Sequence, residues 1–448
     1  MTRIFLFVLF ALGGVSFISS CKNPAAPREP NKFASQATFL RRLDSIRVDN
    51  TTFLLSSGAM RNALSLPSGD LLFVGEVRPP SQLFSQAFVI RTNALGGVRW
   101  ARLYTDSIQT LNSIIPIGSG EFIASGSIFS GSNQTSGYAL LLDSLGNVRW
   151  ARAFADEARS ARFTGSVLLD PNRLLLYGQT RRTLSTGFSL FINDGFVVAC
   201  DLIGNILFQR RLHTLGSFSN TAGADIGFNS GLQVSGGAIL AGYYTPIFDF
   251  VKAGIRRLVA PDLYLLRFNA NGDSTAALLY DAQYPAGDVL DQSVSFNGKL
   301  TTADEAISIA PMPDGNYAVY ARTNSTFYVL IVNASLTGIL RQFPLPSSAT
   351  YSLSEMTIGR DGSFVFVGTS TEKITFEGNR SPAPGGRDVY IAKYSAQGAR
   401  LWEITQGTSL DDVGLSIRET IDGGFVITGE SNSKPLLLKV DERGLLAE

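Results

Sequence analysis

Cysteine and histidine are almost absent from this sequence of 448 residues, which has two cysteines (Cys21 and Cys200) and one histidine (His213). Two cysteines cannot form a disulfide framework, and a zinc centre needs several Cys or His ligands. A single histidine gives little basis for a Ser-His-Asp or Cys-His catalytic group. The sequence therefore predicts no catalytic residue, no metal centre and no cofactor, and a fold that its core alone must stabilise.

Long apolar runs and charge of one sign are also missing. After residue 20 no apolar stretch is long enough to cross a bilayer. The 38 Lys and Arg residues nearly balance the 37 Asp and Glu residues, and both signs are interspersed along the chain. This pattern lacks the basic footprint of a nucleic-acid-binding protein, so we expect no nucleic-acid partner.

The N-terminus carries the features of an export signal. Met1–Arg3 is short and basic, Ile4–Val15 is apolar, and small residues precede Cys21 in the stretch Ile-Ser-Ser-Cys. This stretch resembles the bacterial lipobox, in which the cysteine is lipidated; an ordinary signal peptide with an incidental cysteine is the alternative. The scarcity of cysteine elsewhere favours lipidation. Because Lys22 is not the aspartate that retains some lipoproteins at the inner membrane, we expect an outer-membrane lipoprotein.

What the sequence has in abundance is a repeat. A polar residue, two spacers and a glycine follow an apolar run in seven places. All three tryptophans of the chain (Trp100, Trp150 and Trp402) stand four residues after such a glycine, and Phe208 does so in a fourth copy. The seven copies are Asn93–Gly96, Asp143–Gly146, Asp201–Gly204, Asn269–Gly272, Ser335–Gly338, Ser395–Gly398 and Asp441–Gly444. Self-similarity of this kind indicates a repeat architecture.

A second marker precedes each copy, namely a turn, an apolar run and a small residue. In six units the turn contains glycine, as in Asp361-Gly362 and Asp422-Gly423, which supplies the positive φ that tight hairpins need. Each unit therefore contains four short strands. In the second unit these are expected at Ser113–Ile117, Glu121–Ile128, Tyr138–Asp143 and Asn147–Phe154. Seven such units predict an all-β, seven-bladed β-propeller.

An N-terminal strand is expected to close the ring. The last unit stops with its fourth strand cut short. Phe39–Val48 could form a short helix, but we interpret Ile46–Leu55 as a strand because it aligns with the fourth strand of the first unit. We therefore expect Thr51–Leu55 to pair with Leu436–Val440, which protects two sheet edges.

The repeat pattern G-x-x-x-W followed by D-G-G-F-x-x-x-G resembles the propeller-repeat lipoproteins of many Gram-negative bacteria, over roughly residues 56–448. The resemblance implies a propeller fold behind a lipoprotein signal, and it specifies fold rather than function. The expected domains are a signal peptide (1–20), lipidated Cys21 with a Pro/Ala-rich tether (21–43) and the propeller (44–448).

The long insertions are expected on one face of the propeller. In a four-strand meander, second–third loops and inter-blade connections share a face, and the insertions fall in this set: Arg181–Gly195, Tyr243–Pro261, Asp281–Ala303 and Glu372–Arg387. Long loops on a rigid scaffold are where binding usually resides. The most aromatic insertion makes Tyr243, Tyr244, Phe248 and Phe250 candidate ligand-binding residues; alternatively, these rings cover the top of a core blade.

Carboxylates provide the remaining candidate sites. Six acids precede or begin first strands and could ring the mouth of the channel, as a glycosidase would require: Asp225, Asp304, Glu305, Glu355, Asp411 and Asp412. The alternative is that they are solvated surface acids. Four could hold calcium (Asp288, Asp291, Asp411 and Asp412), but the D-x-[DN]-x-[DN]-G loop that would mark such a site is missing.

The function that follows is a lipid-anchored β-propeller on the outer membrane that acts as a non-enzymatic binding or scaffolding module. Its partners are the membrane, through the N-terminal lipid on Cys21, and a protein or glycan on the long-loop face. The alternatives are a carbohydrate-active enzyme that uses channel-mouth carboxylates and a purely structural component of the cell envelope.

Overall fold

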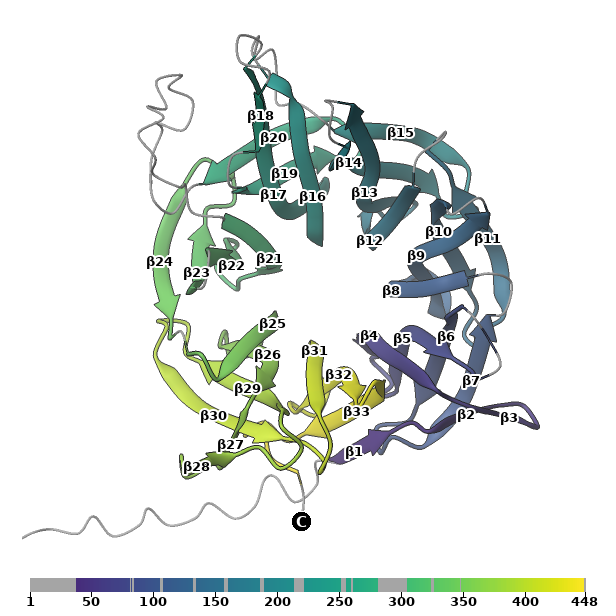
Figure 1. Cartoon of the computed structure of the whole chain (residues 1–448), viewed down its shortest axis with the longest axis vertical. Helices are drawn as coiled ribbons and strands as arrows, with labels where there is room; N and C mark the ends of the chain where they lie inside the picture. The colour runs from purple at the N-terminus through teal and green to yellow at the C-terminus, as the bar shows by residue number, and fades with distance from the viewer. Residues whose placement is uncertain are drawn as a thin grey trace, which may run out of the picture. The chain divides into compact units, whose positions relative to one another are not determined.

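The computed structural model describes residues 38–446, except positions 81, 83, 105–107, 132–133, 157–159, 186–188, 213–220, 251–254, 259–260, 281–303, 324–325 and 347. These residues form seven antiparallel sheets, six of four strands and one of five, arranged as blades around a central axis (Figure 1). The predicted all-β, seven-bladed propeller is therefore confirmed. Within the described residues one 3-10 turn (Gly118–Gly120) interrupts the strands, and no helix is long and apolar enough to span a bilayer.

The first strand of each blade lines the centre of the ring (Figure 1). Blade 1 is β4 (Ser57–Ser65), β5 (Leu71–Arg78), β6 (Gln86–Thr92) and β7 (Val98–Tyr104). Blade 2 is β8 (Ile108–Ile117), β9 (Glu121–Gly131), β10 (Gln134–Leu142) and β11 (Val148–Phe154). Blade 3 is β12 (Ser160–Asp170), β13 (Arg173–Ser185), β14 (Ser189–Asp201) and β15 (Ile206–Leu212). Blade 4 is β16 (Thr221–Val234), β17 (Gly237–Phe250), β19 (Asp262–Asn269) and β20 (Ser274–Tyr280), and β18 (Ile255–Leu258) pairs with β17. Blade 5 is β21 (Asp304–Pro311), β22 (Tyr317–Thr323), β23 (Thr326–Val332) and β24 (Ile339–Leu345).

Blade 6 is β25 (Tyr351–Ile358), β26 (Phe364–Ser370), β29 (Asp388–Tyr394) and β30 (Arg400–Gln406), with a side hairpin of β27 (Glu372–Ile374) and β28 (Arg380–Pro382). Blade 7 is β31 (Asp412–Glu419), β32 (Phe425–Ser431), β33 (Lys434–Val440) and β1 (Phe39–Arg42). A second hairpin, of β2 (Ser45–Val48) and β3 (Thr51–Leu54), connects β1 to blade 1.

Strand alternation gives the propeller two distinct faces. First–second and third–fourth turns lie at one end, which we call the tight-turn face; second–third loops and inter-blade connections lie at the other, which we call the decorated face. The third–fourth turns are held by their polar first residue. Asp143 Oδ1 accepts hydrogen bonds from the N–H groups of Leu145 and Asn147, both at 2.9 Å. Ser395 Oγ accepts in the same way from the N–H groups of Gln397 and Ala399, which explains why the repeat marker begins with a polar residue.

The two repeat markers meet in space between blades. The ring of Trp100, on the fourth strand of blade 1, packs over Gly146 in the third–fourth turn of blade 2. The indole N–H of Trp100 donates to the Ser144 carbonyl at 3.2 Å. The same contact recurs around the ring as Trp150 on Gly204, Phe208 on Gly272, Phe343 on Gly398 and Trp402 on Gly444. The three tryptophans therefore pack between neighbouring blades.

The ring is closed by a different strand from the one expected. Phe39–Arg42 pairs antiparallel with β33, with Phe39 opposite Lys439, whereas Thr51–Leu54 pairs only within the β2–β3 hairpin. Phe39 also packs over Gly96 of blade 1, which is the contact that the outer-strand aromatics make elsewhere. The assignment of Thr51–Leu55 was therefore wrong, because alignment by strand spacing could not distinguish a blade strand from an inserted hairpin.

The core is distributed over the interfaces between blades. In the described residues, buried apolar side chains form seven clusters, and each cluster combines residues from two neighbouring blades. Because both sides of a blade are covered, its middle strands read as continuous apolar runs. Cys200 belongs to one such run and is fully buried, and burial raises the pKa of its thiol to about 12. It therefore behaves as a small apolar side chain.

Candidate functional site

The predicted insertions take several forms at the decorated face. Arg181–Gly195 continues strands β13 and β14 as one long hairpin, and Tyr243–Pro261 includes the end of β17 with β18 paired to it. Glu372–Arg387 contains the β27–β28 hairpin. Asp281–Ala303 lies outside the described residues, as do Cys21, His213, Asp288 and Asp291. Several insertions thus rise on the decorated face as extensions of the blades.

The four candidate aromatic residues are in β17, but they have different surroundings. Tyr244 is buried between blades 3 and 4, where its ring centroid lies 5.9 Å from that of Tyr264. Tyr243 is half-buried near the channel, at the decorated end of blade 4. The side chains of Phe248 and Phe250 lie outside the described part of the structure. Ligand binding by these residues stays a prediction, and Tyr244 is a core residue by its position.

Tyr243 belongs to a small polar cluster with Asp225 and Asn193. The Tyr243 hydroxyl donates to Asp225 Oδ1 at 3.3 Å, and the Asn193 side-chain amide donates to the same oxygen at 3.2 Å. Burial raises the pKa of Asp225, although these donors oppose the shift. The cluster satisfies the carboxylate internally, so it positions the ends of β14, β16 and β17 relative to one another.

The other candidate carboxylates do not converge. Glu305 pairs with Arg322 and Glu355 with Arg418, each at 2.8 Å, and Asp411 accepts from Arg387 Nε at 2.7 Å. In the described residues no group of three Asp, Glu, His or Cys side chains is placed to hold a metal ion. The channel mouth therefore lacks the acid cluster that the carbohydrate-active alternative requires, as far as the structure describes it.

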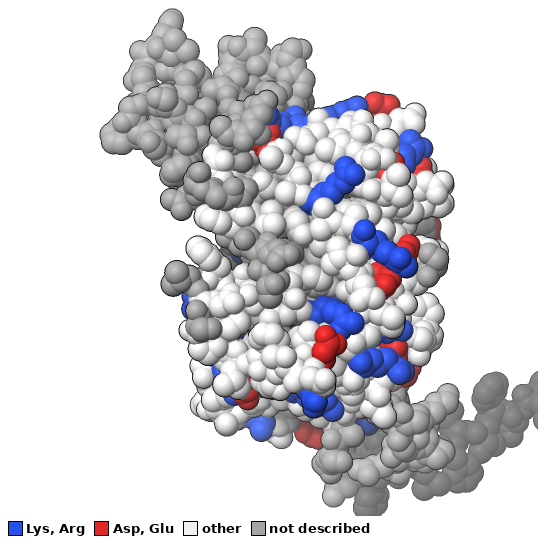
Figure 2. Space-filling model, turned by 90° about the vertical axis from the view of Figure 1, so that its right-hand side faces the viewer, with Lys and Arg blue, Asp and Glu red and all other residues white. Residues whose placement is uncertain are grey.

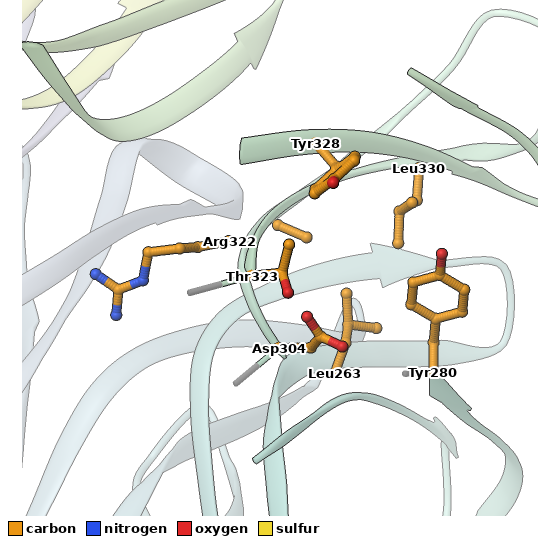
Figure 3. A pocket seen from close by; sticks show the side chains of 8 residues that line it. Leu263, Tyr280, Asp304, Arg322, Thr323, Tyr328 and Leu330 are labelled. Carbon is orange, nitrogen blue, oxygen red and sulfur yellow. The ribbon is translucent and has the colours of Figure 1, made fainter. Parts of the chain in front are cut away.

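Asp304 faces a cavity between blades 4 and 5 instead of the channel. The cavity has a volume of about 10 Å³, which is room for roughly one water molecule. Figure 3 shows Asp304 directed toward Thr323, with Leu263 and Leu330 beside them, while the Arg322 side chain points away. A site of this size cannot admit a substrate.

Exposed aromatic side chains on the decorated face were missed by the sequence analysis. Phe84 lies in the second–third loop of blade 1, and its ring stacks on Phe129 of blade 2 with centroids 5.4 Å apart and an interplanar angle of 22°. Phe376 is exposed at the tip of the β27–β28 hairpin. The sequence marks each of these two sites only by one aromatic residue, Phe84 or Phe376, in a second–third loop. Such rings provide amphipathic contact area for a partner.

A groove between the β2–β3 hairpin and β7 was also missed. Its volume is about 400 Å³, and it is lined by Ile46, Arg47 and Asp49 on the hairpin and by Trp100 and Arg102 on β7, among others. Asp49 and Arg102 form an ion pair across it at 3.5 Å. This groove depends on the hairpin folding back over blade 1, which local sequence does not reveal.

Charge is mixed on the outer surface. Figure 2 shows Lys and Arg alternating with Asp and Glu across the side of the ring that holds blades 1 to 3, without a continuous block of either sign. Several of these charges are paired, as in Arg91 and Arg99 with Asp70, both at 2.8 Å. This surface carries no basic footprint for nucleic acid.

No protein-family profile matches the sequence, and no curated protein matches it. Three solved structures align with most of the chain. The Dos1 propeller aligns with a TM-score of 0.44 and 10% identity, covering 89% of this chain and 95% of its own. An acylaminoacyl peptidase from Pyrococcus horikoshii aligns with a TM-score of 0.45 and 12% identity over 86% of this chain and 51% of the peptidase. The mannosyltransferase MPT-1 from Leishmania mexicana aligns with a TM-score of 0.33 and 8% identity, covering 88% of this chain and 91% of its own.

Proposed function

We propose that this protein is a lipid-anchored binding module of the outer membrane, which presents its decorated face to a protein or glycan partner. The observation that carries the proposal is the division between the two faces. Strand extensions and hairpins rise from the decorated face, whereas the described turns of the other face are tight. Loops and extensions on a rigid scaffold are where binding residues concentrate.

The direction of β1 supports this orientation. β1 runs antiparallel to the third strand β33, so it begins at the tight-turn face and ends at the decorated face. The segment from Lys22 to Thr38 would span at most about 60 Å at full extension. The segment that follows Cys21 therefore joins the propeller at the tight-turn face, which favours presentation of the decorated face away from the bilayer.

Apolar side chains on the tight-turn face of blades 1 to 3 support the same orientation. Leu95, Leu145 and Ile203 occupy equivalent third–fourth turns of three adjacent blades and are 65%, 58% and 68% exposed. The beginning of each following strand adds a further exposed apolar residue: Val98, Val148 and Ile206. One acyl group alone binds membranes weakly, and a row of apolar side chains at the same face supplies a second contact with lipid.

The decorated face offers a partner two exposed aromatic rings, namely Phe376 and Phe84, which stacks on the half-buried Phe129. The carbohydrate-active alternative finds no comparable support, because its described carboxylates are ion-paired, internally hydrogen-bonded or buried. Binding without catalysis is the function that the described residues support best.

Two measurements test the proposal. On intact membranes we expect a cysteine-reactive probe to label Glu377→Cys on the β27–β28 hairpin more rapidly than Asp314→Cys on the tight-turn face. Cys200 is buried and does not interfere. In pull-downs from cell envelopes, Phe376→Asp should lose the partner that Ile421→Asp retains, since these two exposed residues lie on opposite faces. Faster labelling of Asp314→Cys, or equal retention by both variants, would refute the proposal.

A further inference from the structure

We infer that the Asp388–Asp412 pair between blades 6 and 7 binds one hard divalent cation of the Ca²⁺ type. Asp388 begins β29, the third strand of blade 6, and Asp412 begins β31, the first strand of blade 7. Third and first strands both begin at the decorated face, so neighbouring blades bring the two carboxylates together there. This departs from the sequence expectation of no metal site, which did not consider Asp388.

The two carboxylates lie close to each other, packed against Gly407. Asp388 Oδ1 lies 2.5 Å, and Asp412 Oδ2 lies 2.8 Å, from the position that a β-carbon on Gly407 would occupy. Both side chains are at least nine-tenths buried, with exposed fractions of 3% and 0%. The connection from Gly407 to Asp411 covers them, and it is fixed by a hydrogen bond from Asp412 N to the Arg387 carbonyl at 2.8 Å.

The pair has too little positive charge around it. Asp412 accepts hydrogen bonds from Thr408 N at 2.5 Å and Thr408 Oγ1 at 3.0 Å, whereas Asp388 Oδ1 has no hydrogen-bond partner. Among the described residues no Lys, Arg or His forms an ion pair with either carboxylate. Lys373 on β27 acts on Asp388 only at longer range, and Arg387 is engaged by Asp411.

A buried carboxylate in this state is costly, because it has lost water without gaining a donor. Burial, and then the neighbouring Asp412, raise the pKa of Asp388 to about 6. The pair therefore places two carboxylates in a buried site where the described residues supply no ion pair.

Another buried aspartate in the same ring shows how the protein otherwise satisfies such a group. Asp156 is 0% exposed; its carboxylate accepts from Arg211 Nε and from Thr180 Oγ1, each at 2.5 Å. At Asp388 no side chain takes the place of Arg211. A bound cation would make the contact that the guanidinium makes at Asp156.

The surrounding atoms indicate which cation fits. Ca²⁺ binds six to eight oxygen ligands, which include carboxylates, carbonyls and water. Thr408 and Ser431 place hydroxyl oxygens 3.4 Å apart beside Asp412, and the described residues offer no cluster of three His, Cys, Asp or Glu ligands. Two carboxylates with the hydroxyl oxygens beside them suit Ca²⁺ and not Zn²⁺, which prefers nitrogen and sulfur.

The test uses the full chain purified in detergent, stripped with EDTA and exchanged into metal-free buffer at pH 7.5. We expect equilibrium dialysis with ⁴⁵Ca²⁺ to give one bound ion per chain, and CaCl₂ to raise the thermal midpoint. The isosteric variant Asp388→Asn should lower the affinity at least roughly tenfold. The matched control is Asp411→Asn, which removes an adjacent but ion-paired carboxylate, and it should bind Ca²⁺ like the wild type.

Three outcomes would overturn the inference: no stoichiometric Ca²⁺ on the wild type, equal Ca²⁺ binding by Asp388→Asn, or loss of binding in Asp411→Asn alone. The competing occupant is a proton shared by the two carboxylates. In that case Ca²⁺ would neither bind stoichiometrically nor raise the thermal midpoint. If Asp388→Asn does not fold, dialysis on the wild type still decides between the two.

Discussion

Replacement of Gly146 by alanine should destabilise the propeller through two separable effects. Gly146 has a φ of +78°, which costs an L-residue about 1–2 kcal/mol. The added β-carbon would also lie 2.6 Å from Cζ3 of Trp100, whose indole N–H is held by the Ser144 carbonyl. Forcing a methyl group into a packed site costs about 1–3 kcal/mol. The free energy of unfolding should therefore fall by about 2–5 kcal/mol.

Gly236 provides a matched control for the backbone effect. It has a similar φ of +74°, but no atom lies within 4 Å of the position of its missing β-carbon. Gly236→Ala should therefore cost only about 1–2 kcal/mol. The difference between the two alanine variants measures the contact with Trp100.

A double-mutant cycle then isolates that contact. Trp100→Ala opens the space above Gly146, so Trp100→Ala with Gly146→Ala should be more stable than the two single costs predict, by about 1–3 kcal/mol. Urea unfolding followed by circular dichroism gives the four free energies. If Gly146→Ala and Gly236→Ala cost the same and the cycle shows no coupling, the proposed reason for glycine in the repeat marker is wrong.

Three further predictions follow from the same structure. Leu40→Asp in the closing strand β1 should lower the free energy of unfolding by more than about 1 kcal/mol in urea titrations, because Leu40 packs against the blade 6–7 core. Thr52→Asp in the exposed hairpin should change it by less than about 0.5 kcal/mol; equal effects would argue against closure by β1. Burial opposes the shift, but hydrogen bonds from Lys393 and Ser363 lower the pKa of Asp361 to about 2. Its stabilising contribution is therefore present above the ordinary pKa near 4 and is lost as the pH falls toward 2. In thermal melts Asp361→Asn should be less stable than the wild type at pH 7, and the difference should shrink between pH 4 and pH 2; a constant difference would contradict the ion pair. In the non-lipidated Cys21→Ser chain, Leu145→Asp with Ile203→Asp should weaken sedimentation with anionic vesicles at least about threefold, whereas Phe376→Asp should leave it unchanged. If Phe376→Asp weakened vesicle binding more than the double variant did, the decorated face and not the tight-turn face would contact the membrane.

The candidate site shows how far local pattern extends. The sequence identified the decorated face, because loop length and strand order are both local properties. It could not separate Tyr243 from Tyr244, which alternate across one strand and face a polar cluster and a core cluster, respectively. It also missed Asp388, because the only sign of that residue's role is the proximity of Asp412, which follows it by 24 positions and belongs to the next blade.

The sequence by itself determined the seven-fold repeat and the all-β fold, since glycine turns, apolar runs and aromatic positions recur with each unit. Each of these signals acts within a few residues, because in a meander each strand pairs with the next strand along the chain. Only the tertiary structure decided which strand closes the ring. The sequence offered Phe39–Val48 as a possible short helix and Ile46–Leu55 as the closing strand, but in the structure Phe39 packs over Gly96 of blade 1 while its strand pairs with β33. That choice depends on packing between segments almost 400 residues apart, which no local pattern records.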